Sequence, residues 1–236
     1  GKTIPFQLEK ESCNILVEQR KRIVFNICLK AASMNRISCK LKPVNFLPNL
    51  KKTTSDHFMF KSKTRELIIN KKTGLIDRHR VRGTDILKSS SLQLLVMKDY
   101  PDPWGMKVNG FRDMVGKFEL MSETESATFA GVSSSALDPV RRIEEGPVRT
   151  VIEALFRYNH SSLCLRYAIP KETDEIHLQL RIYWLEKDKM LKLSIPTPFK
   201  LGLCKGQVAY GTEEFTSSGE EHVAQKWIGV FSPDLR

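Results

Sequence analysis

The sequence has few of the features from which a chemistry can be read directly. No apolar run is long enough to span a bilayer, and the first residues lack the charged and apolar regions of a secretory signal. No Gly-x-Ser-x-Gly elbow, phosphate-binding loop or dinucleotide fingerprint occurs, and helix signals are almost absent. We therefore expect no membrane as a partner, no nucleotide and no hydrolase of the elbow type.

Cysteine and histidine are scattered. The five cysteines are odd in number and form no Cys-x-x-Cys motif: Cys13, Cys28, Cys39, Cys164 and Cys204. The five histidines are isolated from one another, and no His-x-Asp pair accompanies them: His57, His79, His160, His177 and His222. The sequence thus predicts no metal ligands and no catalytic residues in this chain. Because most of the cysteines lie in apolar runs, it also predicts free buried thiols in a reducing compartment and hence a cytoplasmic location.

Positive charge exceeds negative charge, with 38 lysines and arginines against 27 acids and a net charge of +11. Such an excess can attract nucleic acid or a membrane surface. The basic residues are spread along the chain, often at the polar positions of alternating strands, and no nucleic-acid motif accompanies them. We interpret them as a solvated surface and expect no nucleic acid as a partner, although a basic nucleic-acid-binding β-domain stays open as a third reading.

The sequence is rich in period-two alternation. From Ile176 to Trp184 an apolar residue recurs at every second position, which suits a strand with one face on a core and one in water. After the charged turn at 186–188 the alternation resumes from Leu191 to Ile195, and together the two runs predict a long β-hairpin.

Other apolar runs predict further strands over 13–18, 22–29, 36–42, 65–70, 91–98 and 225–231, with alternation also between 118 and 129. Trp184 and Trp227 lie in strand patterns, so we expect them in the core or at a domain interface. Prolines and polar residues interrupt every pattern between 43 and 55. The predicted fold is all-β, with a small β connector module over 1–55 and a large antiparallel β-sandwich, a supersandwich, over 56–236.

A family resemblance rests on the order of several motifs between Lys61 and Phe231. The motifs are EEGPVRTVIEALFRY, LCLRYAIP, EIHLQLRIYWLEKDKMLKLSIPT, GQVAYGT and HVAQKWIGVFS, preceded by NKKTGLID and KDYPDPWGM. In this order and spacing they resemble the C-terminal β-domain of glycoside hydrolase family 38, the α-mannosidases.

The resemblance implies a multidomain enzyme that uses a zinc-dependent retaining mechanism on α-mannosides, with its catalytic barrel N-terminal to this domain. The chain is then the non-catalytic C-terminal module that supports the barrel, and the zinc belongs to the barrel, with no cofactor here. Its partners are the barrel and, in the full-length protein, the α-mannoside substrate. The domain of the resembled family continues beyond the position of Arg236, so we expect a truncated piece. A stand-alone carbohydrate-binding β-sandwich module is the alternative.

The stretch from Asp99 to Gly105 is the candidate for substrate contact. Two prolines stiffen it, Asp99 and Asp102 carry carboxylates, and Trp104 precedes a glycine. Sugar sites use aromatic faces beside carboxylates, because the ring packs on C–H groups while the oxygens accept hydroxyl protons. The alternative is that Trp104 plugs the end of the sandwich and the aspartates cap turns. The sequence favours the second reading.

Overall fold

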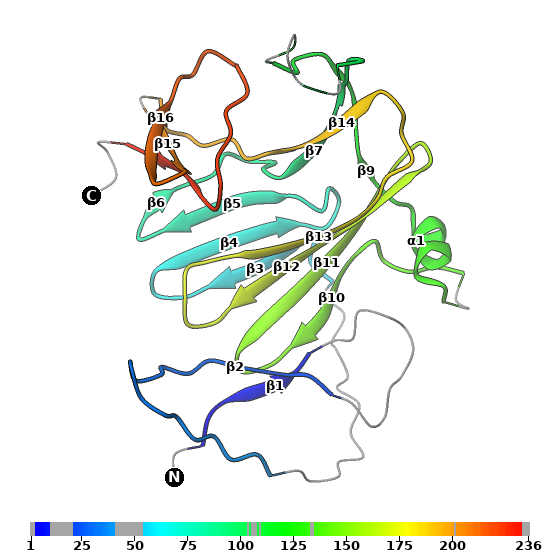
Figure 1. Cartoon of the computed structure of the whole chain (residues 1–236). Helices are drawn as coiled ribbons and strands as arrows, with labels where there is room; N and C mark the ends of the chain where they lie inside the picture. The colour runs from blue at the N-terminus through cyan, green and yellow to red at the C-terminus, as the bar shows by residue number, and fades with distance from the viewer. Residues whose placement is uncertain are drawn as a thin grey trace.

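The computed structural model of this chain is built almost entirely of strands (Figure 1). It describes residues 3–9, 21–40, 54–102, 104, 108, 110–132, 135–200 and 202–232. In chain order the elements are β1 (Phe6–Leu8), β2 (Ile23–Phe25), β3 (His57–Lys61), β4 (Arg65–Asn70), β5 (Ile76–Val81), β6 (Thr84–Asp85), β7 (Gln93–Lys98), β8 (Met114–Lys117), β9 (Glu119–Leu120), α1 (Glu123–Ala130), β10 (Val140–Glu145), β11 (Arg149–Tyr158), β12 (Ser161–Pro170), β13 (His177–Tyr183), β14 (Lys189–Ser194), β15 (Leu203–Val208), β16 (Gly211–Phe215) and β17 (Ile228–Phe231).

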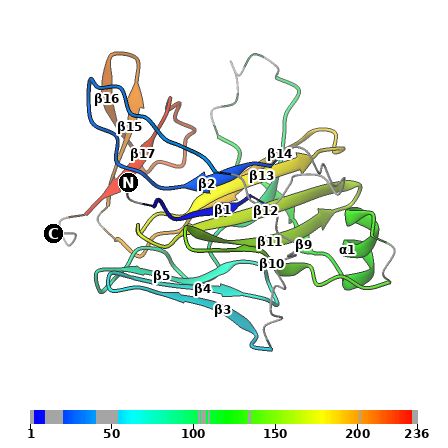
Figure 2. The ribbon, with the colours of Figure 1, turned by 90° about the horizontal axis from the view of Figure 1, so that it is seen from below.

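The strands of the described residues form five sheets, and their pairings are antiparallel. The largest sheet has the order β10-β11-β12-β13, and β9 pairs with β11. A second layer contains β3-β4-β5-β6 and β14-β7-β8, which a bridge between Ile76 and Ser91 connects. Figure 2 shows β3, β4 and β5 as a layer against the largest sheet. The small sheets β1-β2 and β16-β15-β17 lie outside this sandwich.

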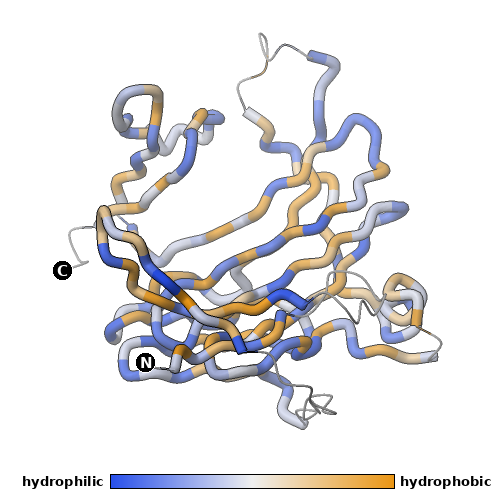
Figure 3. The backbone as a smooth tube through the Cα atoms, turned by 60° about the horizontal axis from the view of Figure 1, so that its bottom comes forward, coloured by the Kyte–Doolittle hydropathy of each residue, from blue (hydrophilic) through white to orange (hydrophobic). Residues whose placement is uncertain are grey.

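The core lies between the two layers. Its buried members come from both of them, for example Leu67 of β4, Val96 of β7, Ile152 of β11 and Leu165 of β12, each fully shielded from solvent. Strand side chains alternate between faces, so each strand gives every second residue to this core. Apolar residues recur along the central strands in Figure 3. The predicted all-β, antiparallel sandwich is confirmed.

Both strands of the predicted hairpin exist, but they do not pair with each other, so the predicted hairpin is wrong. β13 pairs with β12 in the largest sheet, whereas β14 pairs with β7 in the opposite layer. The segment between them crosses the end of the sandwich, and there Asp188 has a left-handed backbone with φ of 52°. Both strands place apolar residues in the common core from opposite sides, and alternation alone does not specify which strand is the neighbour. Trp184 packs against this core, as predicted, with its ring stacked on Phe118 at 6.3 Å.

The stretch from 118 to 129, which we predicted to alternate as a strand, contains the short strand β9 and helix α1. Ser122 is the N-cap: its hydroxyl accepts from the backbone N–H of Glu125 at 3.3 Å, and the Glu125 carboxylate accepts from the N–H of Ser122 at 2.8 Å. Gly131, with φ of 62°, ends the helix. The Ser-x-x-Glu spacing is the signal of this capping box. In the described part of the chain, no helix is long and apolar enough to cross a membrane.

The N-terminal strands only partly follow the prediction. β2 lies within the predicted strand 22–29, but no strand forms over 36–40, and the predicted strand 13–18 lies outside the described residues. β1 pairs with β2. The predicted boundary between 43 and 55 lies mostly outside the described residues, so the division into two domains stays a prediction.

Gln7 of β1 anchors this small sheet to the sandwich. Its Oε1 accepts from the backbone N–H groups of Val148 and Arg149 at 3.0 and 2.9 Å, and its Nε2 donates to the Glu144 carboxylate. Gly146 allows the approach, because a Cβ there would lie 2.4 Å from Gln7 Oε1. The contact fixes β1 at the turn between β10 and β11.

The cysteines differ in their environments. Cys164 of β12 is buried, and burial raises the pKa of its thiol to about 11. Cys204 is half-buried, whereas Cys28 and Cys39 are exposed, so the prediction that the cysteines are buried is wrong for these two. Cys13 lies outside the described residues. Free thiols and a cytoplasmic location stay predictions.

Candidate functional site

The candidate contact loop begins where β7 ends. Asp99 holds its first turn, because its Oδ1 accepts from the backbone N–H of Tyr100 at 2.8 Å while its own N–H donates to the Asp188 carbonyl at 3.0 Å. Asp102 Oδ2 accepts from the backbone N–H of Val108 at 3.3 Å. Both aspartates therefore act as acceptors for turn N–H groups, as one of the two readings predicts.

Trp104 does not plug the sandwich. Its side chain is 83% exposed, whereas a plug would be buried, so this part of the favoured reading is wrong. The sequence around Trp104 does not alternate between apolar and polar residues. It therefore does not indicate whether the ring faces the core or the solvent. The structure brings Asp99, Asp102 and Trp104 onto one loop and leaves the indole face available to a partner.

The base of the loop is fastened. The Tyr100 hydroxyl donates to Asp113 Oδ2 at 2.5 Å, and this hydrogen bond raises the pKa of Tyr100. The Lys98 ammonium lies 5.3 Å from the centre of the Tyr100 ring. The two ends of the loop, at 98–100 and at 113, are thereby tied together.

The far side of the loop contacts the segment before β17. Arg112 donates to the backbone carbonyls of Ser218 at 3.0 Å and Gly219 at 3.2 Å. The Glu221 carboxylate accepts from the N–H of Phe111 and from the Lys192 ammonium, and the hydrogen bond from Lys192 lowers the pKa of Glu221. The loop thus rests on the segment 218–221, although Trp104 is exposed.

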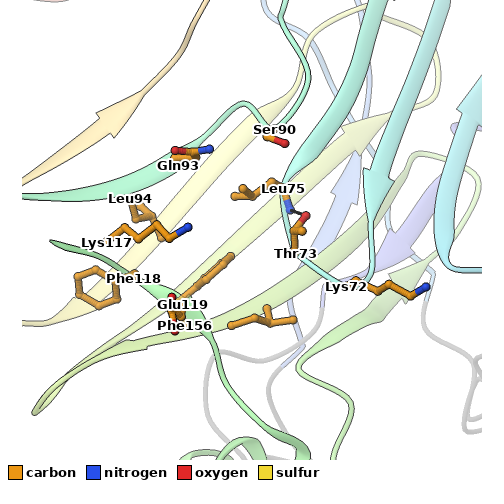
Figure 4. Close-up of a pocket in the computed structure, with 11 residues that line it drawn as sticks. Lys72, Thr73, Leu75, Ser90, Gln93, Leu94, Lys117, Phe118, Glu119 and Phe156 are labelled. Atoms are coloured by element: carbon orange, nitrogen blue, oxygen red, sulfur yellow. Dashed lines mark hydrogen bonds between the residues drawn. The ribbon is translucent and has the colours of Figure 1, made fainter.

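A pocket of about 280 Å³ opens at the edge of the sandwich (Figure 4). It lies between the turn after β4, the start of β7 and the β8–β9 segment. Its lining has an apolar floor and a polar rim, with these members: Lys72, Thr73, Leu75, Ser90, Gln93, Leu94, Lys117, Phe118, Glu119, Leu120 and Phe156. Our reading of the sequence did not single out this pocket, because residues from four separate segments meet in it.

The turn that forms one wall is pinned to the core. The buried Tyr167 hydroxyl donates to the Gly74 carbonyl at 2.6 Å, and burial raises the pKa of Tyr167. Gly74 has φ of 70°, and a Cβ there would lie 2.8 Å from the Phe156 ring. Ser90 on the opposite wall is also left-handed, with φ of 59°. Such conformations persist only where the surroundings enforce them, so the pocket is preformed.

Two buried carboxylates in the largest sheet were not predicted. Glu153 of β11 is 4% exposed and accepts from Arg166 Nε at 2.7 Å and from Arg141. Burial opposes its ionisation, but the two guanidinium groups outweigh that effect and lower the pKa of Glu153. A glycosidase acid needs a raised pKa, so this triad is a cross-strand ion network and not an acid catalyst.

The second buried carboxylate, Glu144 of β10, accepts from Arg149 Nε at 2.9 Å and from Gln7. Glu153 is buried because Arg141 and Arg166 face it in register from the neighbouring strands, whereas Arg149 reaches Glu144 diagonally across β10 and β11. Alternation along one strand reveals neither pairing.

The described residues do not fit a zinc site. Within them, no three His, Cys, Asp or Glu side chains come together to hold a metal ion. His57 and His177 each contact a single carboxylate, Asp77 at 3.4 Å and Glu175 at 3.2 Å. We therefore derive no catalytic step from this part of the chain.

Comparison with known families fits this geometry. A family model described as the glycosyl hydrolases family 38 C-terminal domain matches residues 62–212. The match starts just after β3 and ends inside β16, so it covers more than half of the chain and the whole largest sheet. No curated protein matches the chain. The chain belongs to the family of glycosyl hydrolases family 38 C-terminal domains.

Proposed function

We propose that this chain is the non-catalytic C-terminal module of a zinc-dependent retaining α-mannosidase and that it supports the catalytic barrel. The observation that carries the proposal is the family match over 62–212. A C-terminal domain of a family 38 glycosyl hydrolase has the catalytic domain of the same enzyme as its partner. The α-mannoside is then the substrate of the full-length protein.

The chemistry of the described residues supports a non-catalytic role. Glu144 and Glu153 are each held in ion pairs with arginines, an arrangement that suits a structural ion network and not the acid of a retaining mechanism. We propose that the zinc and both catalytic carboxylates come from the catalytic domain, and that this chain contributes a rigid wall.

We propose that the loop with Asp99, Asp102 and Trp104 is the part of that wall that meets the sugar or the rim of the barrel. An exposed indole on a loop with fastened ends offers a flat apolar surface at little cost in conformational entropy. The same exposed indole favours the second candidate function, a carbohydrate-binding sandwich that acts without a barrel.

Assays of the full-length enzyme and of this chain alone test the proposal. The full-length enzyme should hydrolyse an aryl α-mannoside and lose activity with a zinc chelator, whereas the 236-residue chain should show no turnover with or without zinc. An aryl α-glucoside serves as the matched substrate control. Zinc-dependent turnover by the isolated chain, or a full-length enzyme that prefers the glucoside, would contradict the proposal.

A further inference from the structure

We infer that the pocket between the turn after β4 and the β8–β9 segment is a second saccharide site, which binds one neutral sugar residue. The assignment rests on the lining of the pocket and not on the proposed function. It also lies away from the Trp104 loop, because none of Asp99, Asp102 or Trp104 lines it.

The size of the pocket selects a small ligand. Its volume of about 280 Å³ lies just below the range of typical ligand pockets, roughly 300–1,000 Å³. The floor is apolar, since Leu75, Leu94 and Phe156 form it. A pyranose ring presents a face of C–H groups that matches such a floor, and its hydroxyl groups point to the perimeter.

The rim carries polar side chains that are available to bind a ligand. In the described part of the chain, the side chains of Ser90, Gln93, Lys117 and Glu119 have no hydrogen-bond or ion-pair partner. Figure 4 shows Ser90, Gln93 and Lys117 grouped around Leu75, with Thr73 on the other side of it. Together they offer hydrogen-bond donors, acceptors, and hydroxyl groups that can do both. The hydroxyl groups around a sugar ring require this mixture.

The charges at the rim favour a neutral ligand over an anion. Lys117 and Glu119 carry opposite charges and face the same opening. Lys72, the other cation, extends away from them in Figure 4, and its ammonium lies 2.6 Å from the Asp56 carboxylate. A phosphate or carboxylate ligand would gain one cation and meet one acid, so it has no net electrostatic advantage here.

The walls hold these groups in place before any ligand arrives. Gly74 is pinned by Tyr167, and Ser91 exchanges backbone hydrogen bonds with Ile76 at 3.0 and 3.2 Å. Glu119 lies on β9, which pairs with β11. A preformed site loses little freedom on binding, and for a single sugar we expect a dissociation constant on the order of 1 mM.

Amide NMR of the 236-residue chain tests the inference, with methyl α-D-mannopyranoside, methyl α-D-glucopyranoside and inorganic phosphate as probes. We expect saturable shifts at Thr73, Ser90, Gln93 and Lys117 with at least one glycoside, and none with phosphate. Three outcomes would overturn it: shifts with phosphate alone, shifts confined to the Trp104 loop, or no shift at a glycoside concentration of about 50 mM, roughly 50 times the expected dissociation constant.

Paired variants provide the control. Lys117→Ala with Glu119→Gln should weaken glycoside binding at least about tenfold, since two rim groups are lost. Lys226→Ala with Glu213→Gln removes the same charges at exposed positions outside the pocket and should bind like the parent chain. Gln93→Leu is a second test at the rim. Equal affinity in the first and second pairs, together with unchanged affinity in Gln93→Leu, would overturn the assignment.

Discussion

Gly74 shows how a single residue without a Cβ lets two parts of the molecule meet. Its φ of 70° is left-handed, and an added Cβ would lie 2.8 Å from the buried Phe156 ring and 3.1 Å from the Cβ of Ala154. For Gly74→Ala we expect a loss of about 2–4 kcal/mol in the free energy of unfolding, from backbone strain and overpacking together. Urea unfolding measures this loss.

Gly83→Ala is the matched control. Gly83 is also left-handed, with φ of 85°, but nothing lies within 4 Å of the added Cβ. The strain alone should cost about 1–2 kcal/mol. If both variants lose the same free energy of unfolding, contact with Phe156 contributes nothing to the loss at Gly74. The turn at Gly74 would then not pack tightly against the core.

His79 is a buried histidine whose charge state should affect stability. Burial lowers the pKa of its ring, and the positive charge of Arg65 acts in the same direction. A hydrogen bond to the backbone of Asp174 opposes this shift only in part. The folded state therefore binds this proton only at a lower pH than the unfolded state, whose histidine titrates near about 6.5. Stability is fully present above that pH and falls as the pH decreases, by at most about 1.4 kcal/mol per unit.

The variant His79→Leu isolates this effect, because it removes the titrating ring. The difference in unfolding free energy between the parent and His79→Leu should stay constant from pH 7 to 8. It should then shift in favour of His79→Leu as the pH falls from 6.5 to 5. A difference that stays constant over the lower range would show that His79 takes up its proton equally well in the folded chain.

At the scale of elements, the attachment of β1 depends on one side chain. Gln7 accepts two backbone N–H groups and donates to Glu144, and it is 7% exposed. Gln7→Leu would leave the two backbone N–H groups without this partner, at about 1–3 kcal/mol for each, while Glu144 keeps its hydrogen bonds from Arg149. We expect β1 to detach from the sandwich, which hydrogen exchange would report as lost protection of the Val148 and Arg149 amides.

Leu8→Ala serves as the control on the same strand, because Leu8 is 53% exposed and faces away from this contact. Its exchange pattern should match that of the parent chain. Retained protection in Gln7→Leu would show that other contacts hold β1 in place.

The same scale separates what the sequence predicts from what it does not. Alternation located β13 and β14 because side-chain direction is a local property of a strand. It did not predict their partners, since pairing depends on which apolar faces meet across the core. Helix α1 was missed although Ser122 and Glu125 carry the capping-box spacing, because the apolar residues around it also fit a strand.

The candidate site shows a similar limit. The turn chemistry of Asp99 and Asp102 follows from local sequence, because a carboxylate hydrogen-bonds N–H groups close to it in the chain. The exposure of Trp104 and the pocket rim depend on contacts between distant segments. The sequence patterns within 98–106 and 117–120 do not predict contacts with distant segments.

Across the whole molecule, a few long-range contacts fix the two layers. Arg65 of β4 is 5% exposed and donates to the carbonyls of Pro170, Thr173 and Glu175, at 2.8, 2.7 and 3.2 Å. It therefore holds the β12–β13 connection of the opposite layer. Tyr167 and Gly74 make a second such contact inside the sandwich. The loop that carries the exposed Trp104 follows β7 of one of these layers.

The role of this loop is tested in the full-length enzyme with Trp104→Ala. Because the ring is 83% exposed, its removal should change the free energy of unfolding by no more than about 0.5 kcal/mol. If the indole contacts the sugar or the barrel rim, kcat/KM on an aryl α-mannoside should fall roughly ten- to a hundredfold, which corresponds to about 1.4–2.8 kcal/mol.

Trp104→Ala separates the roles more cleanly than Asp102→Ala, because Asp102 also binds the N–H of Val108 and its loss would loosen the loop. Tyr210→Ala is the control, since Tyr210 is fully exposed at the turn between β15 and β16. Both variants should keep the melting temperature of the parent, and only Trp104→Ala should lose activity. Parent-like kcat/KM in Trp104→Ala would place the loop outside the substrate cleft and contradict the proposed contact.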